Sequence, residues 1–542
     1  MTQAPSTARL VERAGLWVGL LLFAGLLLCP VPGGMSSPAW RLSAVTVLMA
    51  VLWLTEAVPM AVTSLVPLAA FPLLGIQSSA VVSRGYFDQN VFLYMGGFII
   101  ALGIEKCGLH RRLALRIVQF VGCGLRQIVL GMMLATGFLS MWISNTASTM
   151  LMFPIALALA AAVGEMLEHT AAGQTPGIEA AANSPVLPEA RLRTLSIALL
   201  LGIAYSASLG GLATTVGTPT NIAMIGIWEK QPELVAQYGG FSMGTWLVTF
   251  LPLAVLMTLT AWLVLTRGLS EPQEARKIGN AFFAQRLAEL GPASPAERRM
   301  LVVFGITALL WILRSPLEFG GVRILPGWAP PLHQWIVEQL GVVDDYGTSP
   351  AVHDSTVALL MAILLFVIPG ATMADGRVGR LMDWETVQHR LPWGILLLIG
   401  GGLVLAGGFE STGLSRWIGS EFVEHVRGWH PVLLVAVVCL LMTFLTEFTS
   451  NVATVSTLVP ILLAASLSLG VDPRLVIVPA TISASCAFML PIATPPNAIV
   501  FSSGQIPMRE MMRQGVILNL IGVVLVTAVT FLLLRPLMGV TL

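Results

Sequence analysis

The sequence predicts an all-α polytopic membrane protein with about eleven transmembrane helices and two re-entrant hairpins. The 542 residues are 56% hydrophobic and only 11% charged, whereas soluble proteins carry about 25% charged residues. Apolar stretches recur along the chain, and many reach the length of about 20 residues that a bilayer crossing needs. Two of these stretches carry a similar polar break near their middle. Together the observations indicate a transporter rather than a globular enzyme.

Charge and cysteine usage exclude other classes of protein. The net charge of +1 gives no attraction to nucleic acid. The five cysteines are scattered without metal-site spacing, so we expect neither a disulfide framework nor a metal centre. The first apolar run, about Leu16 to Leu28, resembles a signal peptide. No convincing cleavage site follows it and many spans do, so we expect a retained first helix.

The predicted elements follow in chain order. We place spans near residues 14–31, 41–57, 60–76, 90–107, 193–227, 244–266, 299–316, 355–372, 391–409, 473–503 and 514–538. The segments are an N-terminal first helix in 1–40, a first repeat in 41–270, a cytoplasmic charged loop in 271–298 and a second repeat in 299–542.

Two further apolar stretches, 126–163 and 431–469, are predicted to be re-entrant hairpins. Each is long enough for two short helices and has a Ser-Asn pair near its centre, Ser144-Asn145 or Ser450-Asn451. Two full crossings would need roughly 40 purely apolar residues and a turn in water. Backbone that leaves its helix within the bilayer persists only where protein buries it or where it lines a cavity. We therefore expect both hairpin tips near the midplane.

Loop charge predicts the orientation. Basic residues gather at the N-terminus and after the fourth, sixth and eighth spans, whereas acidic residues dominate the loop 317–354. Because cytoplasmic loops carry an excess of Lys and Arg, we expect a cytoplasmic N-terminus and an extracytoplasmic C-terminus. The expected location is the cell membrane, the inner membrane of a bacterium.

The two halves repeat each other. Gly96-Gly97 matches Gly401-Gly402 at a shift of 305 residues, and Ser144-Asn145 matches Ser450-Asn451 at a shift of 306. Five full crossings separate the hairpins in our assignment, and an odd number inverts the second copy. An inverted-topology repeat is typical of alternating access around a central site. Simple duplication in a structural membrane protein is the alternative, but it does not require polar breaks at matched positions.

A second pair of polar breaks completes the candidate site. Gly-Thr-Pro-Thr-Asn at 217–221 follows the first hairpin, and Ala-Thr-Pro-Pro-Asn at 493–497 follows the second. Corresponding interruptions in two halves point to a transporter's binding site. The candidate groups are Ser140, Ser144, Asn145, Thr146, Gly217 and Thr218 in the first half, and Thr446, Thr449, Ser450, Asn451, Ala493 and Thr494 in the second.

The chemistry of these groups suits an anion together with cations. Neither cluster contains Lys, Arg or His. Freed carbonyls and helix C-termini suit sodium, while hydroxyls, amides and helix N-termini suit an anion. Bound cations can neutralise a multivalent anion in a site of low dielectric constant. The alternative is that Ser, Thr, Gly and Pro only kink or pack these helices, which does not explain four matched breaks.

Two carboxylates accompany the site. Glu447 lies within one turn of Ser450, and we expect it to order the hairpin tip or tune an ion site rather than bind the ion directly. Glu56, at a predicted helix end, fits a functional role and an interfacial position equally well.

These motifs resemble those of the divalent anion:sodium symporter family. The likeness rests on Ser144-Asn145-Thr146, Ser450-Asn451-Val452, the two Thr-Pro breaks, and Trp53 to Pro59, and it runs from about residue 41 to 510. The resemblance implies a homodimer in the lipid membrane, each protomer having a scaffold domain and an elevator-type transport domain. It also implies import of dicarboxylates, citrate or sulfate coupled to sodium, which would be the co-transported ion.

The resemblance also implies roles for individual residues. It places the first sodium ion at Ser140, Ser144, Asn145 and Gly217, and the second at Thr446, Thr449, Asn451 and Ala493. It places the substrate carboxylates at Ser144, Asn145, Thr146, Thr218, Ser450, Asn451, Val452, Thr494 and Pro495. The chain departs from the family at Val452, where many members have threonine, and at Thr220, where the second proline is absent. Val452 removes a hydroxyl from the substrate cradle and leaves the identity of the anion open.

The leading interpretation is therefore a sodium-coupled importer of a divalent organic anion, with a C4-dicarboxylate ahead of citrate and sulfate. A sodium-independent dicarboxylate exchanger of the same fold is the alternative within transporters. An intramembrane hydrolase would need a nucleophile and base or metal ligands within the spans, and the sequence has no such motif. We therefore do not expect an enzyme.

Overall fold

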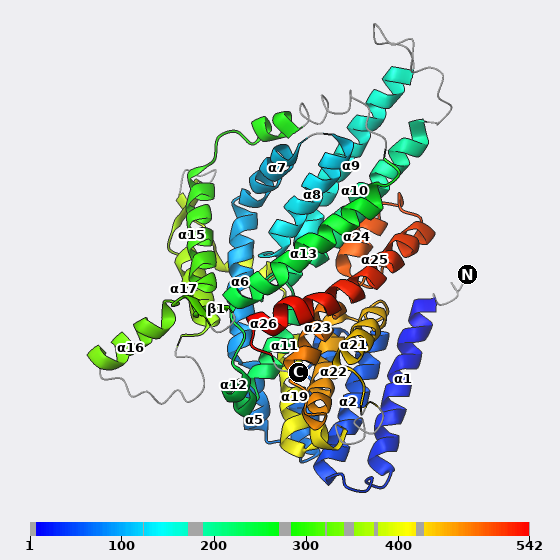
Figure 1. Cartoon of the computed structure of the whole chain (residues 1–542), viewed down its shortest axis with the longest axis vertical. Helices are drawn as coiled ribbons and strands as arrows, with labels where there is room; N and C mark the ends of the chain where they lie inside the picture. The colour runs from blue at the N-terminus through cyan, green and yellow to red at the C-terminus, as the bar shows by residue number, and fades with distance from the viewer. Residues whose placement is uncertain are drawn as a thin grey trace.

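The computed structural model describes residues 7–122, 124–171, 188–269, 283–319, 322–340, 352–372, 378–418, 426 and 428–540. Almost all of its regular structure is helical (Figure 1). Seven helices in the described residues are long and apolar enough to cross a membrane, and seven shorter apolar helices accompany them. The structure confirms the predicted fold class, an all-α polytopic membrane protein.

The chain begins with long helices joined by shorter ones. They are α1 (Thr7–Leu28), α2 (Ser37–Thr55), α3 (Met60–Thr63), α4 (Val66–Leu73), α5 (Ser79–Tyr86), α6 (Gln89–Lys106) and α7 (Leu109–Val121). The predicted span 60–76 is instead the two short helices α3 and α4. Pro67 stands in the first turn of α4, where proline is tolerated because that N–H would have no helical partner.

The first hairpin and the first broken helix follow. Their elements are α8 (Leu125–Ser140), α9 (Asn145–Ala171), α10 (Pro188–Leu212), α11 (Pro219–Glu229), α12 (Pro232–Tyr238) and α13 (Met243–Thr266). The break in the hairpin falls at residues 141–144, as the Ser-Asn pair predicts. The predicted span 193–227 is interrupted at residues 213–218, where the Gly-Thr-Pro motif lies.

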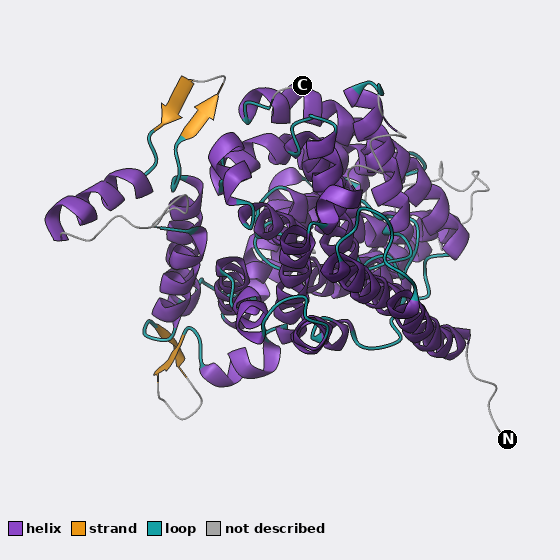
Figure 2. Ribbon diagram, turned by 90° about the horizontal axis from the view of Figure 1, so that it is seen from below, coloured by secondary structure: helices purple, strands orange, loops and turns teal. Residues whose placement is uncertain are grey.

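The middle of the chain contains the only strands that the described residues form. The elements are α15 (Pro295–Ile312), β1 (Leu317–Phe319), β2 (Val322–Leu325), α16 (Ala329–Leu340), α17 (Asp354–Leu365), β3 (Pro369–Thr372), β4 (Val378–Arg380), α18 (Trp384–Arg390) and α19 (Trp393–Thr412). Each pair, β1–β2 and β3–β4, is antiparallel and lies at the edge of the body (Figure 2). The predicted span 355–372 is wrong at its end, because Pro369 cannot continue a helix and starts β3. Of the predicted loop 271–298, residues 271–282 lie outside the described residues.

The second hairpin and the second broken helix complete the fold. They are α21 (Pro431–Leu445), α22 (Asn451–Ser468), α23 (Arg474–Ala484), α24 (Pro495–Phe501) and α25 (Met508–Val529), followed by the π-helix η1 (Thr530–Leu534) and α26 (Arg535–Leu537). The hairpin is interrupted at residues 446–450 and the broken helix at 485–494, again at the polar motifs.

Helix α10 lies at the centre of the first hairpin's packing. In its apolar part, Leu192–Leu212, 94% of the 18 residues assessed are buried. The helix packs against α8, α9 and α13 (Figure 1). The backbones of α8 and α10 touch, because a Cβ added to Gly210 would lie 2.1 Å from the carbonyl oxygen of Gly137. Glycine at both positions therefore lets the end of α8 lie against α10, next to the first break.

The two halves cross over at the breaks. Helix α11 of the first half packs against α22 of the second hairpin, and α24 of the second half packs against α9 of the first hairpin. Helix α19 also contacts α22 closely, since a Cβ on Gly402 would lie 2.5 Å from the Oγ atom of Ser456. This reciprocal packing brings both hairpin interruptions and both helix interruptions to one place.

Candidate functional site

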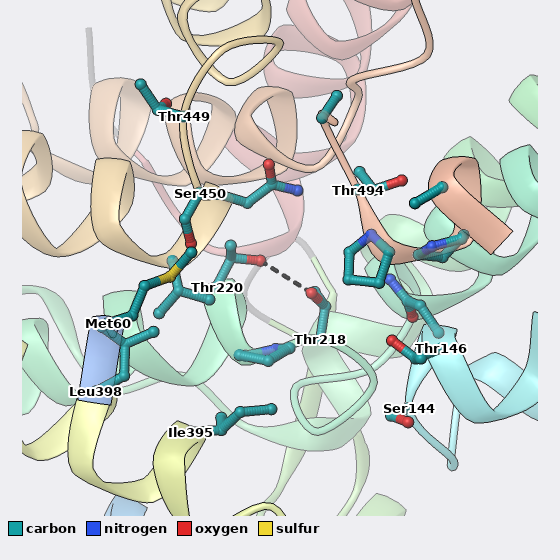
Figure 3. Close-up of a pocket in the computed structure, with 18 of the residues that line it drawn as sticks. Met60, Ser144, Thr146, Thr218, Thr220, Ile395, Leu398, Thr449, Ser450 and Thr494 are labelled. Carbon is teal, nitrogen blue, oxygen red and sulfur yellow. Dashed lines mark hydrogen bonds between the residues drawn. The ribbon is translucent and has the colours of Figure 1, made fainter. Parts of the chain in front are cut away.

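The four interruptions meet at one cavity. We name residues 141–144 the first tip, 446–450 the second tip, 213–218 the first break loop and 485–494 the second break loop. The cavity has a volume of about 780 Å³, and all four segments line it (Figure 3). Of the candidate residues, it gathers Ser144, Asn145, Thr146, Gly217, Thr218, Thr449, Ser450, Asn451, Val452, Ala493, Thr494 and Pro495. Ser140 and Thr446 are fully buried and do not line it.

Helix N-termini and uncharged polar side chains line the cavity. The first residues of α9, α11 and α22 are among the lining residues. The positive end of each of these helix dipoles therefore borders the cavity, where it would favour a negative ligand. No Lys, Arg or His is among the described residues that line the cavity, and its one charged lining residue is Glu56. Glu56 is exposed in a left-handed conformation at the end of α2, with φ 48°.

The first tip forms a cluster of oxygen atoms. The Ser140 Oγ atom lies 2.6 Å from the Asn145 Oδ1 atom and 2.6 Å from the carbonyl oxygen of Ala207. A hydroxyl has one proton to donate, so it can satisfy only one of these two acceptors at a time. Gly211 contacts the same cluster, because a Cβ there would lie 2.7 Å from Asn145 Oδ1 and 3.1 Å from the carbonyl oxygen of Gly217. The excess of acceptor oxygens suits a cation.

The second tip is built differently. The Thr446 hydroxyl lies 2.9 Å from the carbonyl oxygen of Met442 and 3.1 Å from that of Thr443, both within α21. The Thr449 hydroxyl lies 3.0 Å from the carbonyl of Leu445 and 2.5 Å from the Thr454 hydroxyl. The Oδ1 atom of Asn451 is buried without a hydrogen-bond partner in the described structure. A buried acceptor left unpaired costs free energy, so this oxygen is available to a ligand.

Hydroxyl groups connect the two break loops. Thr218 and Thr220 lie 3.2 Å apart through their Oγ1 atoms (Figure 3), and Thr220 Oγ1 lies 2.9 Å from the Ser485 Oγ atom of the second break loop. All three residues are buried. Thr220, where the sequence lacks the second proline of the motif, therefore forms a polar contact between the two halves.

Glu447 holds the second tip against the second break loop. Its Oε1 atom accepts from the backbone N–H groups of Phe488 and Met489 at 2.8 and 2.9 Å and from the Asn519 Nδ2 atom at 2.6 Å. Its Oε2 atom accepts from the N–H of Leu490 at 2.9 Å. Successive backbone N–H groups of this kind form an anion-binding concavity. The side chain is 1% exposed and does not line the cavity, so the geometry matches the supporting role that the sequence predicts.

Sequence reasoning did not identify the apolar wall of the cavity. Met60, Tyr94, Phe98, Ile395 and Leu398 line it from α3, α6 and α19, and Figure 3 shows three of them together on one side. The repeated Gly-Gly pairs on α6 and α19 were the one available signal. They mark these helices as matched elements without indicating that they border the site.

The two tips differ in their aromatic cover. Trp142 of the first tip stacks on Trp311 with centroids 6.5 Å apart and planes at 2°, and it meets Phe304 edge-on at 5.3 Å. Both partners belong to α15. The matched residue of the second tip, Phe448, is 65% exposed. The two matched aromatic residues therefore differ in their surroundings, since Trp142 packs on α15 and Phe448 is exposed.

The chain resembles known proteins over nearly its whole length. The family model described as the sodium:sulfate symporter transmembrane region matches residues 11–540. The chain is 35% identical to the sodium-dependent dicarboxylate transporter SdcS of Staphylococcus saprophyticus, over 98% of this chain and 92% of that protein. It is 33% identical to the Na(+)/citrate cotransporter of Rattus norvegicus, over 93% of this chain and 92% of that protein.

Among solved structures, the chain resembles MtrF of Neisseria gonorrhoeae, which belongs to a class of antimetabolite efflux pumps. The TM-score is 0.51 at 12% identity, and the match covers 96% of this chain and 98% of that one. At this identity the likeness concerns the fold alone.

Proposed function

The chain belongs to the sodium:sulfate symporter family, and on that premise we propose that it imports a C4-dicarboxylate by coupling its entry to sodium. It is a transporter of the membrane and not an enzyme, since its family and its relatives are transporters. Sodium is the co-transported ion, and the substrate is a small divalent anion. The expected location is the bacterial inner membrane, with a cytoplasmic N-terminus and an extracytoplasmic C-terminus.

One observation carries the proposal. A single cavity combines three helix N-termini, which favour an anion, with unpaired or crowded oxygen atoms, which favour a cation. Permanent positive side chains are absent among the described lining residues. The anion would therefore need co-bound cations to offset the cost of leaving water, which couples its binding to sodium.

The site residues follow from this division. We assign the first sodium ion to Ser140, Ser144, Asn145 and Gly217, and the second to Thr446, Thr449, Asn451 and Ala493. We assign the anion to Ser144, Asn145, Thr146, Thr218, Ser450, Asn451, Val452, Thr494 and Pro495. The fully buried Ser140 and Thr446 would act at the sodium ions only, because neither reaches the cavity.

Transport requires the loaded site to face each side of the membrane in turn. We assign the two hairpins and broken helices to a transport domain that moves like an elevator against a scaffold, in a homodimer. The inverted repeats divide at the charged segment 271–298, with the hairpins entering from opposite faces. The different surroundings of Trp142 and Phe448 support alternating access, since Trp142 packs on α15 while its matched residue Phe448 is exposed.

Uptake of labelled succinate into proteoliposomes tests the function. We expect uptake to require an inward sodium gradient and to fall to the background of empty liposomes when choline replaces sodium. An uptake that ignores sodium but needs dicarboxylate inside the vesicles would contradict symport and indicate an exchanger. Competition by unlabelled citrate, sulfate and tartrate in the same assay tests the C4 assignment.

The Val452→Thr variant tests the choice of anion. Thr146 occupies the matched position of the first half, and Val452 lines the cavity. A new hydroxyl would add one hydrogen bond, worth about 1 kcal/mol or roughly a fivefold change in affinity. We expect citrate, which carries more acceptor oxygens, to compete better with succinate in this variant. The control Val452→Ile adds no donor and should leave the order of competitors unchanged; equal competition in wild type and Val452→Thr would contradict the assignment.

A further inference from the structure

Two buried asparagines close the break loops in the same way. The Nδ2 atom of Asn221 donates to the carbonyl oxygens of Gly211 at 3.3 Å and Thr214 at 2.8 Å, ten and seven residues earlier in the chain. The Nδ2 atom of Asn497 donates to the carbonyl oxygens of Ala487 at 3.2 Å and Leu490 at 3.0 Å, also ten and seven residues earlier. Each carboxamide therefore ties the helix that follows the break to the backbone of the break loop, and Asn221 also to the end of α10.

The amide oxygens match as well. The Oδ1 atoms of Asn221 and Asn497 are both buried and without a hydrogen-bond partner in the described structure, and both side chains are 0% exposed. The two carbonyl acceptors fix the amide orientation, because a rotated amide would place its oxygen against them. An unpaired buried acceptor costs free energy. The two halves therefore share both the pair of donated bonds and the unpaired oxygen, at the same place relative to the break.

In the first half, the residues whose carbonyl groups accept from Asn221 contact the segment to which we assign the first sodium ion. The Cα atom of Gly211 lies against both Asn145 Oδ1 and the Gly217 carbonyl, since a Cβ there would meet each of them. The Thr214 hydroxyl donates to the carbonyl of Met141 in the first tip at 2.6 Å. Asn221 thus bonds to Gly211 at the end of α10 and to Thr214 of the first break loop, both of which contact the first hairpin.

The second half reaches the same connection with other chemistry. The Leu490 carbonyl that accepts from Asn497 also accepts from the N–H of Ala493 at 3.2 Å, and Ala493 supplies a carbonyl to the second sodium assignment. The N–H of Leu490 donates to Glu447, which occupies the position that Met141 has in the first tip. In both halves, the acceptor that lies seven residues before the asparagine, Thr214 or Leu490, also bonds to the hairpin tip.

We infer that Asn221 and Asn497 are a matched pair of positioning residues, each setting the geometry of one sodium site through its break loop without touching the ion or the anion. This inference rests on the proposed function. Partners that orient the ligands of a metal ion typically change its affinity by roughly 10- to 100-fold when they are mutated. Loss of either amide should therefore weaken sodium binding by that factor.

Sodium-dependent thermal stabilisation of the purified full-length protein tests the inference without requiring transport. Asn221→Leu and Asn497→Leu keep the side-chain size and delete both donors. We expect each variant to need roughly 10- to 100-fold more sodium than wild type for half-maximal stabilisation. In uptake assays at saturating sodium, the succinate concentration for half-maximal uptake should stay near the wild-type value. A general loss of structure would change both quantities together.

Asn90→Leu is the matched control. Asn90 is also buried with an unpaired Oδ1 atom, and its Nδ2 atom donates to Asp88 and Glu229 at 3.0 and 2.7 Å, outside both break loops. It should lower the melting temperature without moving the sodium dependence. An equal sodium shift in this control would overturn the inference, as would a wild-type sodium dependence in both loop variants.

The remaining outcomes are also decisive. If the leucine variants do not fold, Asn221→Ala and Asn497→Ala, which leave room for water, are measured in the same way. Failure of these to fold would overturn the inference, because the amides would then serve the fold rather than sodium affinity. A wild-type protein that sodium does not stabilise would instead contradict the proposed function itself.

Discussion

Replacing Asn145 or Asn451 by alanine is expected to abolish sodium-driven uptake while the protein remains folded. Asn145 contributes an oxygen to the crowded cluster of the first tip, and Asn451 has a buried oxygen that no donor satisfies. By our assignment, each change removes a proposed ligand of a sodium ion and an amide proposed to bind the anion. Uptake depends on both ions binding together, so loss of either site should reduce it to the level of empty liposomes. Labelled succinate uptake measures this.

Folding should survive both substitutions. The Asn145 change removes one hydrogen bond, worth about 1 kcal/mol, and Ser140 keeps the Ala207 carbonyl as its acceptor. The Asn451 change removes an oxygen that makes no hydrogen bond in the described structure. Size-exclusion profiles and melting without sodium should therefore match wild type. Thr457→Val on α22 is the control, because its hydroxyl bonds only within the helix, and it should transport normally. Wild-type uptake in either asparagine variant would remove that residue from the site.

The sequence predicts most of the framework because the backbone groups of a helix that is interrupted inside a membrane need hydrogen-bond partners, and polar residues in an apolar stretch mark such places. A helix interruption within the bilayer needs polar residues and a protein or aqueous cavity around it. The Ser-Asn and Thr-Pro motifs therefore mark where α9, α11, α22 and α24 begin. Repetition of the Ser-Asn motif at a shift of 306 residues, and of the Thr-Pro motif at a shift of 276 residues, adds the pairing of the two halves. These local signals were enough to predict the four segments that line the cavity.

Other features depend on tertiary contacts that no local pattern reports. The strands β3 and β4 follow an apolar run that reads like the rest of α17. The final asparagine of each Thr-Pro motif was visible in the sequence, but its partners lie ten and seven residues away across an interrupted helix. The contact between Trp142 and Trp311 joins residues that no repeat relates. Such connections need the folded geometry.

Glu447 shows the same limit and leads to the second large expected effect. Every hydrogen bond that it makes in the described structure is one that it accepts. Glu447→Ala would leave the backbone N–H groups of Met489 and Leu490 without their acceptor, while the N–H of Phe488 would keep the Asn519 Oδ1 atom at 3.2 Å. Each buried unpaired donor costs about 1 to 3 kcal/mol, so we expect a loss of several kcal/mol and no sodium-driven uptake. Thermal unfolding and succinate uptake measure these two effects.

Glu447→Gln separates the charge from the shape of this side chain. Glutamine keeps one acceptor oxygen for Phe488 and Met489, but its NH2 group would face the N–H of Leu490, two donors in contact. We therefore expect a melting temperature between those of wild type and Glu447→Ala. Met141→Leu, at the matched position of the first tip, is the control. The Met141 side chain has no carboxylate to accept hydrogen bonds, and a volume-conserving apolar change usually costs little. A Glu447→Gln protein as stable and as active as wild type would mean that a neutral side chain suffices there. The second break loop would then be held by its shape alone, and the carboxylate would have no part in setting the second sodium site.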